Sequence, residues 1–199
     1  MKRREIDIFG VLVGIVIGCI LGFFLSTRIN IEMPIDNEDE VLALVGNVYL
    51  LQIEKTTNPG NAQNILVDIN SKGLYAVAVL YGNNYYIYGG IANTESELES
   101  LKLEFSSKGY NPIIKREYIL DKPNIVIDEE NKYKFYSECT DNLIRSLKGE
   151  KLEISAETKT NPANLELFSA MLTIDSIQNE KLLSEIRLSI YKMITEDLN

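Results

Sequence analysis

Val48-Tyr49-Leu50-Leu51-Gln52 and Tyr85-Tyr86-Ile87-Tyr88-Gly89 are strand-like stretches that open two copies of one pattern. A helix-like segment follows each stretch and ends at Ser71-Lys72-Gly73 in the first copy and at Ser107-Lys108-Gly109 in the second. Leu51 aligns with Ile87, so the Ser-Lys-Gly triplet recurs at the same offset. A self-similar period of this length marks one structural unit that is used twice.

Hydrophobic periodicity and turn residues predict a strand, a helix and a strand in each copy. Asn58-Pro59 suits the start of the first helix, and Thr94 with Glu97 forms a capping box for the second. The order β-α-β-β-α-β predicts an α+β fold of the ferredoxin or RNP type, with a four-stranded antiparallel sheet covered by helices on one face and open on the other. The expected strands are 47–56, 74–81, 85–92 and 110–119, and the helix of the first copy is expected over 59–72.

The whole chain of 199 residues divides into five predicted segments. They are a cytoplasmic N-terminus (1–7), a transmembrane helix (8–27), a linker (28–46), the sheet domain (47–120) and a C-terminal helical region (121–199). In the last segment, an amphipathic helix is expected from Glu129 to Lys148, and a longer helical stretch runs from Asn161 to about Asp197 with a break near 175–180. The apolar sides of these helices must pack on a partner surface. That surface is provided by the other helices, by the sheet domain or by a second chain.

The uncharged run from Ile8 to Thr27 can span the ~30 Å hydrocarbon core of a bilayer as one helix. Basic residues 2–4 precede it and an acidic stretch follows, so we expect a single-pass protein of the cell membrane with a cytoplasmic N-terminus and an extracytoplasmic C-terminal domain. Cys19 lies in this run in a lipobox-like context, which leaves lipidation as the alternative. The helix also carries a glycine every fourth residue, a pattern that favours a homodimer or pairing with another membrane protein: Gly10, Gly14, Gly18 and Gly22.

Composition excludes several classes of function. The net charge of −9 argues against a nucleic-acid partner, because neutralising phosphates requires a basic surface. The absence of histidine removes imidazole acid–base catalysis and imidazole metal ligation. The sequence shows no nucleophile–base pair, metal-ligand cluster or phosphate loop. We therefore expect no enzyme activity, no metal and no cofactor.

Residues of about 48–118 resemble the SPOR domain, the sporulation-related repeat of bacterial cell-envelope proteins. The matches are Tyr49-x-Leu51-Gln52, Asn61-Ala62, Lys72-Gly73 and Tyr85-Tyr86-Ile87-x-x-Gly90, followed by the second helix and Gly109. The resemblance implies peptidoglycan binding, especially to glycan strands stripped of stem peptides, during cell division or sporulation. The chain departs from the family pattern at Glu54 and Thr56, which puts a carboxylate on or near the implied sugar-binding face.

The resemblance implies that the open sheet face holds the glycan. Strand alternation places Leu51 and Ile87 under the helices. The opposite face then receives Leu50, Gln52, Glu54, Tyr86, Tyr88 and Gly90. Of these, Gln52, Tyr86 and Tyr88 are the candidate glycan-binding residues. The alternative is a membrane scaffold that binds another envelope protein through the sheet face, the C-terminal helices or the transmembrane glycine groove.

Overall fold

A computed structural model describes residues 47–119 and 130–198. These residues belong to one compact unit, Leu42–Asn199, and a separate unit covers Met1–Val41. Within the described ranges, none of the helices combines the length and the apolarity needed to cross a bilayer. The predicted transmembrane helix (8–27), its four glycines and Cys19 lie outside the described residues.

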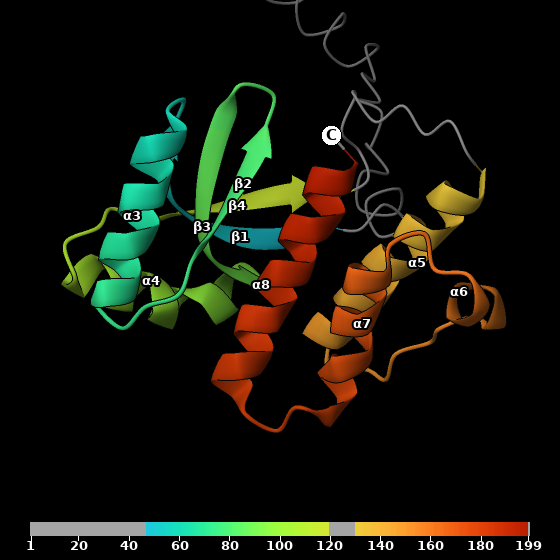
Figure 1. Cartoon of the computed structure of the whole chain (residues 1–199). Helices are drawn as coiled ribbons and strands as arrows, with labels where there is room; N and C mark the ends of the chain where they lie inside the picture. The colour runs from blue at the N-terminus through green and yellow to red at the C-terminus, as the bar shows by residue number, and fades with distance from the viewer. Residues whose placement is uncertain (1–46, 120–129, 199) are drawn as a thin grey trace, which may run out of the picture. The chain divides into compact units, whose positions relative to one another are not determined.

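The elements follow the predicted order, and a helical layer follows the sheet in sequence (Figure 1). The first part contains β1 (Asn47–Thr56), α3 (Pro59–Ser71), β2 (Val77–Tyr81), β3 (Asn84–Ala92), the 3-10 helix η1 (Glu95–Leu98), α4 (Glu99–Ser107) and β4 (Ile113–Tyr118). The second part contains α5 (Glu130–Leu147), α6 (Ala156–Thr160), α7 (Leu165–Thr173), η2 (Ile174–Ser176) and α8 (Glu180–Asp197).

The four strands form one sheet in the order β2-β3-β1-β4, and every neighbouring pair is antiparallel. This confirms the predicted α+β fold and its four-stranded antiparallel sheet. The ladder between β1 and β3 is irregular, because the register shifts between Leu51 and Gln52 and again between Gln52 and Glu54. These bulges change which side chains share a face further along β3.

The ends of α3, α4 and α8 follow the signals in the sequence. The capping box predicted at Thr94 is not formed, because the Thr94 hydroxyl donates to Glu97 at 2.8 Å and caps no backbone N–H. The Asn58 Oδ1 atom accepts hydrogen bonds from Gly60 N at 2.8 Å and Asn61 N at 3.2 Å, which satisfies two donors at the start of α3. Gly73 and Gly109 follow α3 and α4 with φ of 77° and 91°, a conformation that favours glycine. Asn179 caps α8 by accepting from Leu182 N at 3.0 Å. This cap begins a new helix at the break predicted near 175–180.

One hydrophobic core lies between the sheet and the helices α3 and α4. Its fully buried members come from both repeats and include Leu51, Ile69, Ile87 and Phe105. The inward positions of Leu51 and Ile87 are therefore confirmed. Because α4 packs close to β3, a Cβ atom on Gly89 would lie 2.5 Å from the Phe105 ring.

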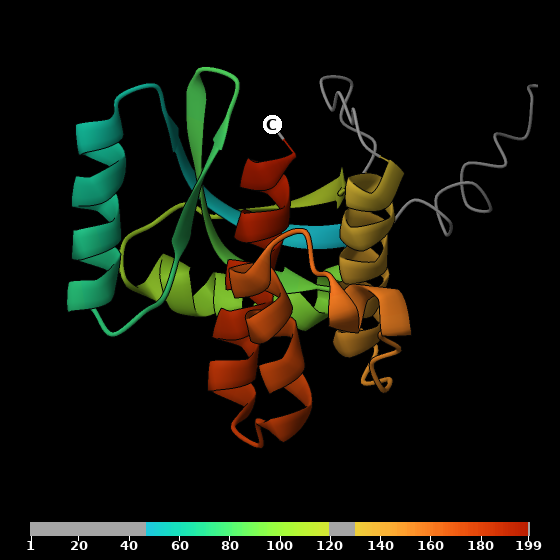
Figure 2. The ribbon, with the colours of Figure 1, turned by 45° about the vertical axis from the view of Figure 1, so that its right-hand side comes forward.

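A second and larger core fills the opposite face of the sheet, so the expectation of an open face is wrong. Strand residues on this face pack against α5, α7 and α8, and α8 contacts both β2 and β3 (Figure 2). The buried set includes Val48, Leu50, Val77, Val79, Tyr88, Leu143, Phe168, Leu188, Ile190, Tyr191 and Ile194. The sheet of the compact unit is thus the middle of three layers, since its C-terminal helices bury their apolar sides on it.

Candidate functional site

The structure brings the three candidate glycan-binding residues together. Gln52 on β1 is the cross-strand partner of Tyr88 on β3. The rings of Tyr86 and Tyr88 have centroids 6.2 Å apart and planes only 8° apart, so they lie side by side on one face. Strand alternation therefore placed all three residues correctly. Gly90, which was expected on the same face, instead faces α4, because a Cβ atom there would lie 2.6 Å from Leu101 Cδ2.

Two of these three residues are buried, and helix α8 covers one of them. Tyr88 is 3% exposed and Gln52 is 8% exposed. The Tyr88 ring meets the Tyr191 ring of α8 edge to face, with centroids 5.8 Å apart and planes at 84°. The hydroxyls of Tyr75 and Ser189 share a hydrogen bond of 2.7 Å, which ties α8 to the segment that precedes β2. In this arrangement, a glycan strand cannot reach Tyr88 or Gln52.

The two buried residues of the site, Gln52 and Tyr88, carry polar groups in apolar surroundings. Burial raises the pKa of Tyr88 well above its ordinary value, and the nearby Tyr191 and Glu117 raise it further. Within residues 47–119 and 130–198, the Gln52 amide oxygen is buried without a hydrogen-bond partner. Such a group costs about 1–3 kcal/mol. Tyr88 therefore behaves as a neutral member of the core between the sheet and α8, and Gln52 is buried opposite it on β1.

The third residue stays within reach of solvent. Tyr86 is partly buried, and its ring lies 5.0 Å from the Lys55 ammonium, in cation–π geometry. Lys55 is exposed and is the cross-strand partner of Tyr86. Glu54, which was expected on this face, is exposed but pairs with Ile87 on the opposite face, because the β1–β3 register shifts between Gln52 and Glu54. We call Tyr86 with Lys55 the aromatic end of the sheet face. It is the part of the predicted site that a ligand can contact in this conformation.

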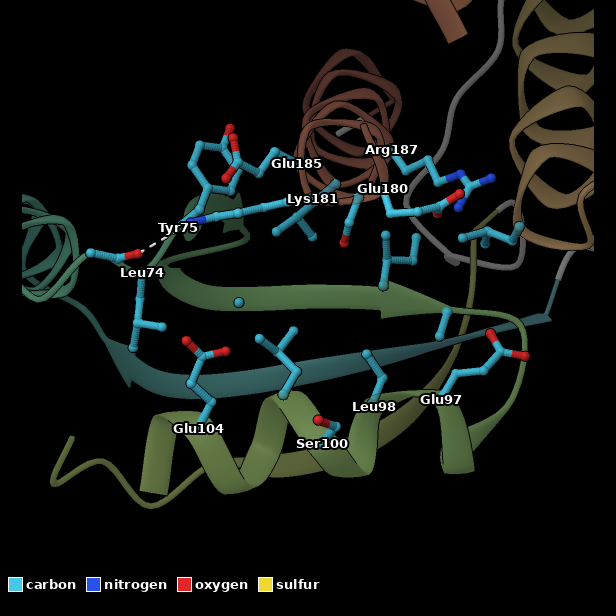
Figure 3. A pocket seen from close by; sticks show the side chains of 18 residues that line it. Leu74, Tyr75, Glu97, Leu98, Ser100, Glu104, Glu180, Lys181, Glu185 and Arg187 are labelled. Atoms are coloured by element: carbon cyan, nitrogen blue, oxygen red, sulfur yellow. Dashed lines mark hydrogen bonds between the residues drawn. The ribbon is translucent and has the colours of Figure 1, made fainter. Parts of the chain in front are cut away.

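A pocket that the sequence did not indicate lies at the end of β3. It has a volume of about 590 Å³ and is bounded by β3, by η1 and α4, and by α8 (Figure 3). Its charged lining residues are Glu97, Glu104, Glu180, Lys181, Glu185 and Arg187. The residues come from segments far apart in the sequence, so periodicity could not group them. The predicted strands 74–81 and 85–92 have equal lengths, so nothing in the sequence indicated that β2 begins only at Val77 and does not pair with the end of β3.

Neither a metal-binding cluster nor an accessible thiol occurs among the described residues. Among residues 47–119 and 130–198, no group of three or more Cys, Asp or Glu is arranged to hold a metal ion. Cys139 is a buried free thiol on α5, and burial raises its pKa to about 12. A thiol with that pKa stays protonated at neutral pH and is a poor nucleophile.

Comparisons with known proteins gave one structural likeness. No protein-family model matches the chain, and no curated protein matches it. The chain is similar to the solution structure of the peptidoglycan binding domain of the B. subtilis cell wall lytic enzyme CwlC, with 20% sequence identity. The match covers 36% of this chain and 90% of that domain, with a TM-score of 0.33. This TM-score is too low to establish a shared fold.

Proposed function

We propose that this chain is a non-catalytic peptidoglycan-binding protein of the bacterial cell envelope, acting in division or sporulation. In this proposal residues 8–27 anchor it in the cell membrane, and the compact unit lies outside, where it binds glycan strands that lack stem peptides. The observation that carries the proposal is the cluster of Gln52, Tyr86 and Tyr88 on one sheet face, as strand alternation predicts.

The cost of displacing α8, compared with the free energy of glycan binding, decides which part of that cluster binds the glycan. Moving α8 away would expose Leu188, Ile190, Tyr191 and Ile194, all of which are now at most 1% exposed. At about 1.5–3 kcal/mol for each side chain, this exposure costs roughly 6–12 kcal/mol. A weak ligand with a millimolar Kd supplies only about 4 kcal/mol. The glycan therefore binds with α8 in place, at the aromatic end formed by Tyr86 and Lys55.

The chemistry of the aromatic end suits a neutral or weakly charged sugar chain. The exposed side of the Tyr86 ring gives an apolar platform for a sugar face, and its hydroxyl can donate or accept a hydrogen bond. The Lys55 ammonium donates to hydroxyl or carboxyl oxygens. Tyr88, which α8 covers, packs beside Tyr86 and holds its ring in position. Glu54 pairs with Ile87 and therefore lies on the other face of the sheet, away from the aromatic end.

Co-sedimentation with purified sacculi tests this proposal. The full chain, kept in detergent, is mixed with sacculi before and after an amidase has removed the stem peptides. We expect greater retention on the amidase-treated sacculi, because removal of the peptides uncovers the glycan. Retention on neither preparation would contradict peptidoglycan binding. Equal retention on both would contradict the preference for stripped glycan.

A second candidate function is a membrane scaffold for another envelope protein. The observation that favours it is that the chain's own helices fill the sheet face that was expected to bind glycan. In this case the glycine groove of residues 8–27 holds a homodimer or a membrane-protein partner. Replacing Gly14→Leu together with Gly18→Leu should then abolish crosslinking to that partner. An unchanged crosslinking profile would contradict a role for the groove.

A further inference from the structure

The end of strand β3 lacks a neighbour on one side. The pairing between β2 and β3 ends at Val77 and Tyr88, whereas β3 continues to Ala92. The β1 side of the same stretch is paired, since Leu51, Leu50 and Tyr49 lie opposite Gly90, Ile91 and Ala92. No strand among residues 47–119 and 130–198 pairs with the other side of Gly89–Ala92. We call this stretch the β3 edge.

The segment that would extend β2 along the β3 edge is held elsewhere. Leu74 N donates to Ile69 O at 3.2 Å, and the Leu74 side chain is buried in the core under α3. The Tyr75 hydroxyl is bonded to Ser189 of α8. Gly73, Leu74 and Tyr75 therefore line the pocket without pairing with β3. The pocket exists because this segment turns away from the edge.

The side chains of the β3 edge do not block a chain from approaching in the plane of the sheet. Gly89 and Gly90 have no side chains, and their positions face α4. Ile91 is directed to the opposite core, where it is buried. Strand edges of this kind accept extended peptides by backbone hydrogen bonding. At ~3.3 Å per residue, Gly89–Ala92 offers roughly 13 Å of strand.

Both walls of the pocket present carboxylates. Glu104 lies on the α4 wall, and Glu180 and Glu185 lie on the α8 wall (Figure 3). Within the described ranges, the carboxylates of these three residues have no hydrogen bond or ion pair. Glu97, also at the pocket, accepts a hydrogen bond from Thr94 Oγ1 at 2.8 Å.

The two basic residues of the pocket, Lys181 and Arg187, donate hydrogen bonds to other parts of the chain. Arg187 donates to both the hydroxyl and the backbone carbonyl of Ser146 on α5, with an Nε–Oγ distance of 2.8 Å. The Lys181 ammonium lies 3.4 Å from the carbonyl oxygen of Gly73. Both side chains keep their positive charges, and Arg187 also interacts electrostatically with Glu180 and Glu97. Four carboxylates against two cations leave the pocket with a net charge of −2.

We propose that the β3 edge binds an extended peptide segment rich in lysine or arginine, which adds as a strand beside Gly89–Ala92. Successive residues of such a strand point to opposite faces, so its side chains reach α4 and α8 in turn. Basic side chains on both faces then meet Glu104 on one wall and Glu180 or Glu185 on the other. The chain's own linker does not suit the groove, because residues 32–40 are acidic.

A labelled peptide tests the proposal with the full chain in detergent micelles. The probe is an acetylated and amidated Lys-Val-Lys-Lys-Val-Lys with a fluorophore, followed by fluorescence anisotropy at low salt. We expect saturable binding to the wild-type chain and no binding of the matching peptide with glutamate in place of lysine. A copy that is N-methylated at alternate residues keeps the charges but loses backbone donors, and we expect it to bind at least tenfold more weakly.

Variants and hydrogen exchange place the peptide on the chain. Glu104→Gln with Glu185→Gln should weaken binding at least fivefold, whereas the control pair Glu157→Gln with Glu166→Gln, on α6 and α7, should leave it unchanged. Amide exchange should slow at 89–92 when the peptide binds.

Two outcomes overturn the proposal: no binding of the lysine peptide, or equal binding of its N-methylated copy, which would mean attraction by charge alone. Tyr86→Ala should leave peptide binding unchanged, so this test and the glycan test fail independently.

Discussion

Gly89 and Gly90 set how closely α4 approaches the sheet. A Cβ atom on Gly89 would lie 2.5 Å and 2.7 Å from two carbons of the Phe105 ring, and 3.0 Å from Ile53 Cδ1. Phe105 is fully buried and its ring also meets Tyr110 edge to face, so it has little space to move. These two glycines therefore fix the packing of the second repeat and also leave the β3 edge open.

Replacing Gly89→Ala should lower the free energy of unfolding by about 1–3 kcal/mol, because overpacking a tight core forces neighbouring side chains to shift. Urea unfolding followed by circular dichroism measures the change. Leu103→Ala is the control. Leu103 lies on α4, the helix that packs over Gly89, but its side chain is 69% exposed. Equal losses in the two variants would contradict the packing role of Gly89.

The buried thiol of Cys139 makes stability depend on alkaline pH. Burial raises its pKa from 9.0 to about 12, so between these values the unfolded chain loses the thiol proton while the folded chain keeps it. The folded state then binds more protons, and the free energy of unfolding must fall as the pH rises above 9.0. The buried phenols of Tyr88 and Tyr191, with raised pKa values, add to the fall at higher pH.

Urea unfolding at a series of pH values checks this expectation. Cys139→Ala should show a shallower decline just above pH 9.0, where the unfolded thiol titrates before the unfolded phenols. In the same experiments, iodoacetamide should modify Cys139 slowly in the folded chain and rapidly in urea. Rapid modification of the folded chain would show that the thiol is accessible.

At the scale of elements, α8 is the main difference between the expected fold and the observed one. Its buried side turns the free face of the sheet into a second core, and it also forms one wall of the pocket. Because α8 packs on β2, β3, α5 and α7, it should unfold together with the sheet and not as a separate helix.

Ile190→Ala tests the packing of α8. Ile190 is fully buried, so its truncation should cost about 2–5 kcal/mol of unfolding free energy. Leu182 lies on the same helix, but its side chain is 47% exposed. Leu182→Ala should therefore lower the free energy of unfolding far less. Thermal unfolding of both variants measures the difference, and a single cooperative transition in each would support one folding unit. A small effect of Ile190→Ala would mean that α8 is loosely attached.

Much of the first half of the fold was predictable because its signals are local. Strand alternation, Asn58, and the glycines that follow α3 and α4 are read from neighbouring residues, and they gave the element order and the faces of Gln52, Tyr86 and Tyr88. Gly90 was misplaced, because the β1–β3 bulges shift the register and no residue pattern announces them. The predicted 74–81 strand begins only at Val77, since Leu74 N donates to Ile69 O at the end of α3 and Tyr75 is bonded to Ser189 of α8.

The covered sheet face was harder to predict, because an amphipathic helix does not specify the surface on which it packs. One signal was available in the sequence. The run from Ala76 to Leu80 is apolar at every position, whereas a strand with one solvated face alternates. Within the observed strand, Val77 and Val79 face the second core and Ala78 faces the first. Continuous apolarity in a strand therefore indicated layers on both faces.

At the scale of the whole molecule, three binding surfaces are proposed for three different partners. In these proposals the predicted helix over residues 8–27 is for the membrane, the aromatic end for glycan and the β3 edge for a basic peptide. In cells, a fluorescent fusion of the full chain should concentrate at division or sporulation septa, where stripped glycan is exposed. A uniform membrane signal would favour the scaffold function instead.

The most direct measurement is the apparent Kd of the full chain for amidase-treated sacculi, with Tyr86→Ala compared against Tyr133→Ala. Both variants remove a partly exposed tyrosine, and Tyr133 lies on α5, outside the sheet. An aromatic contact is worth about 0.5–1.5 kcal/mol, so Tyr86→Ala should weaken binding about two- to tenfold while Tyr133→Ala leaves it unchanged. Equal Kd values for wild type and Tyr86→Ala would contradict glycan binding at the aromatic end.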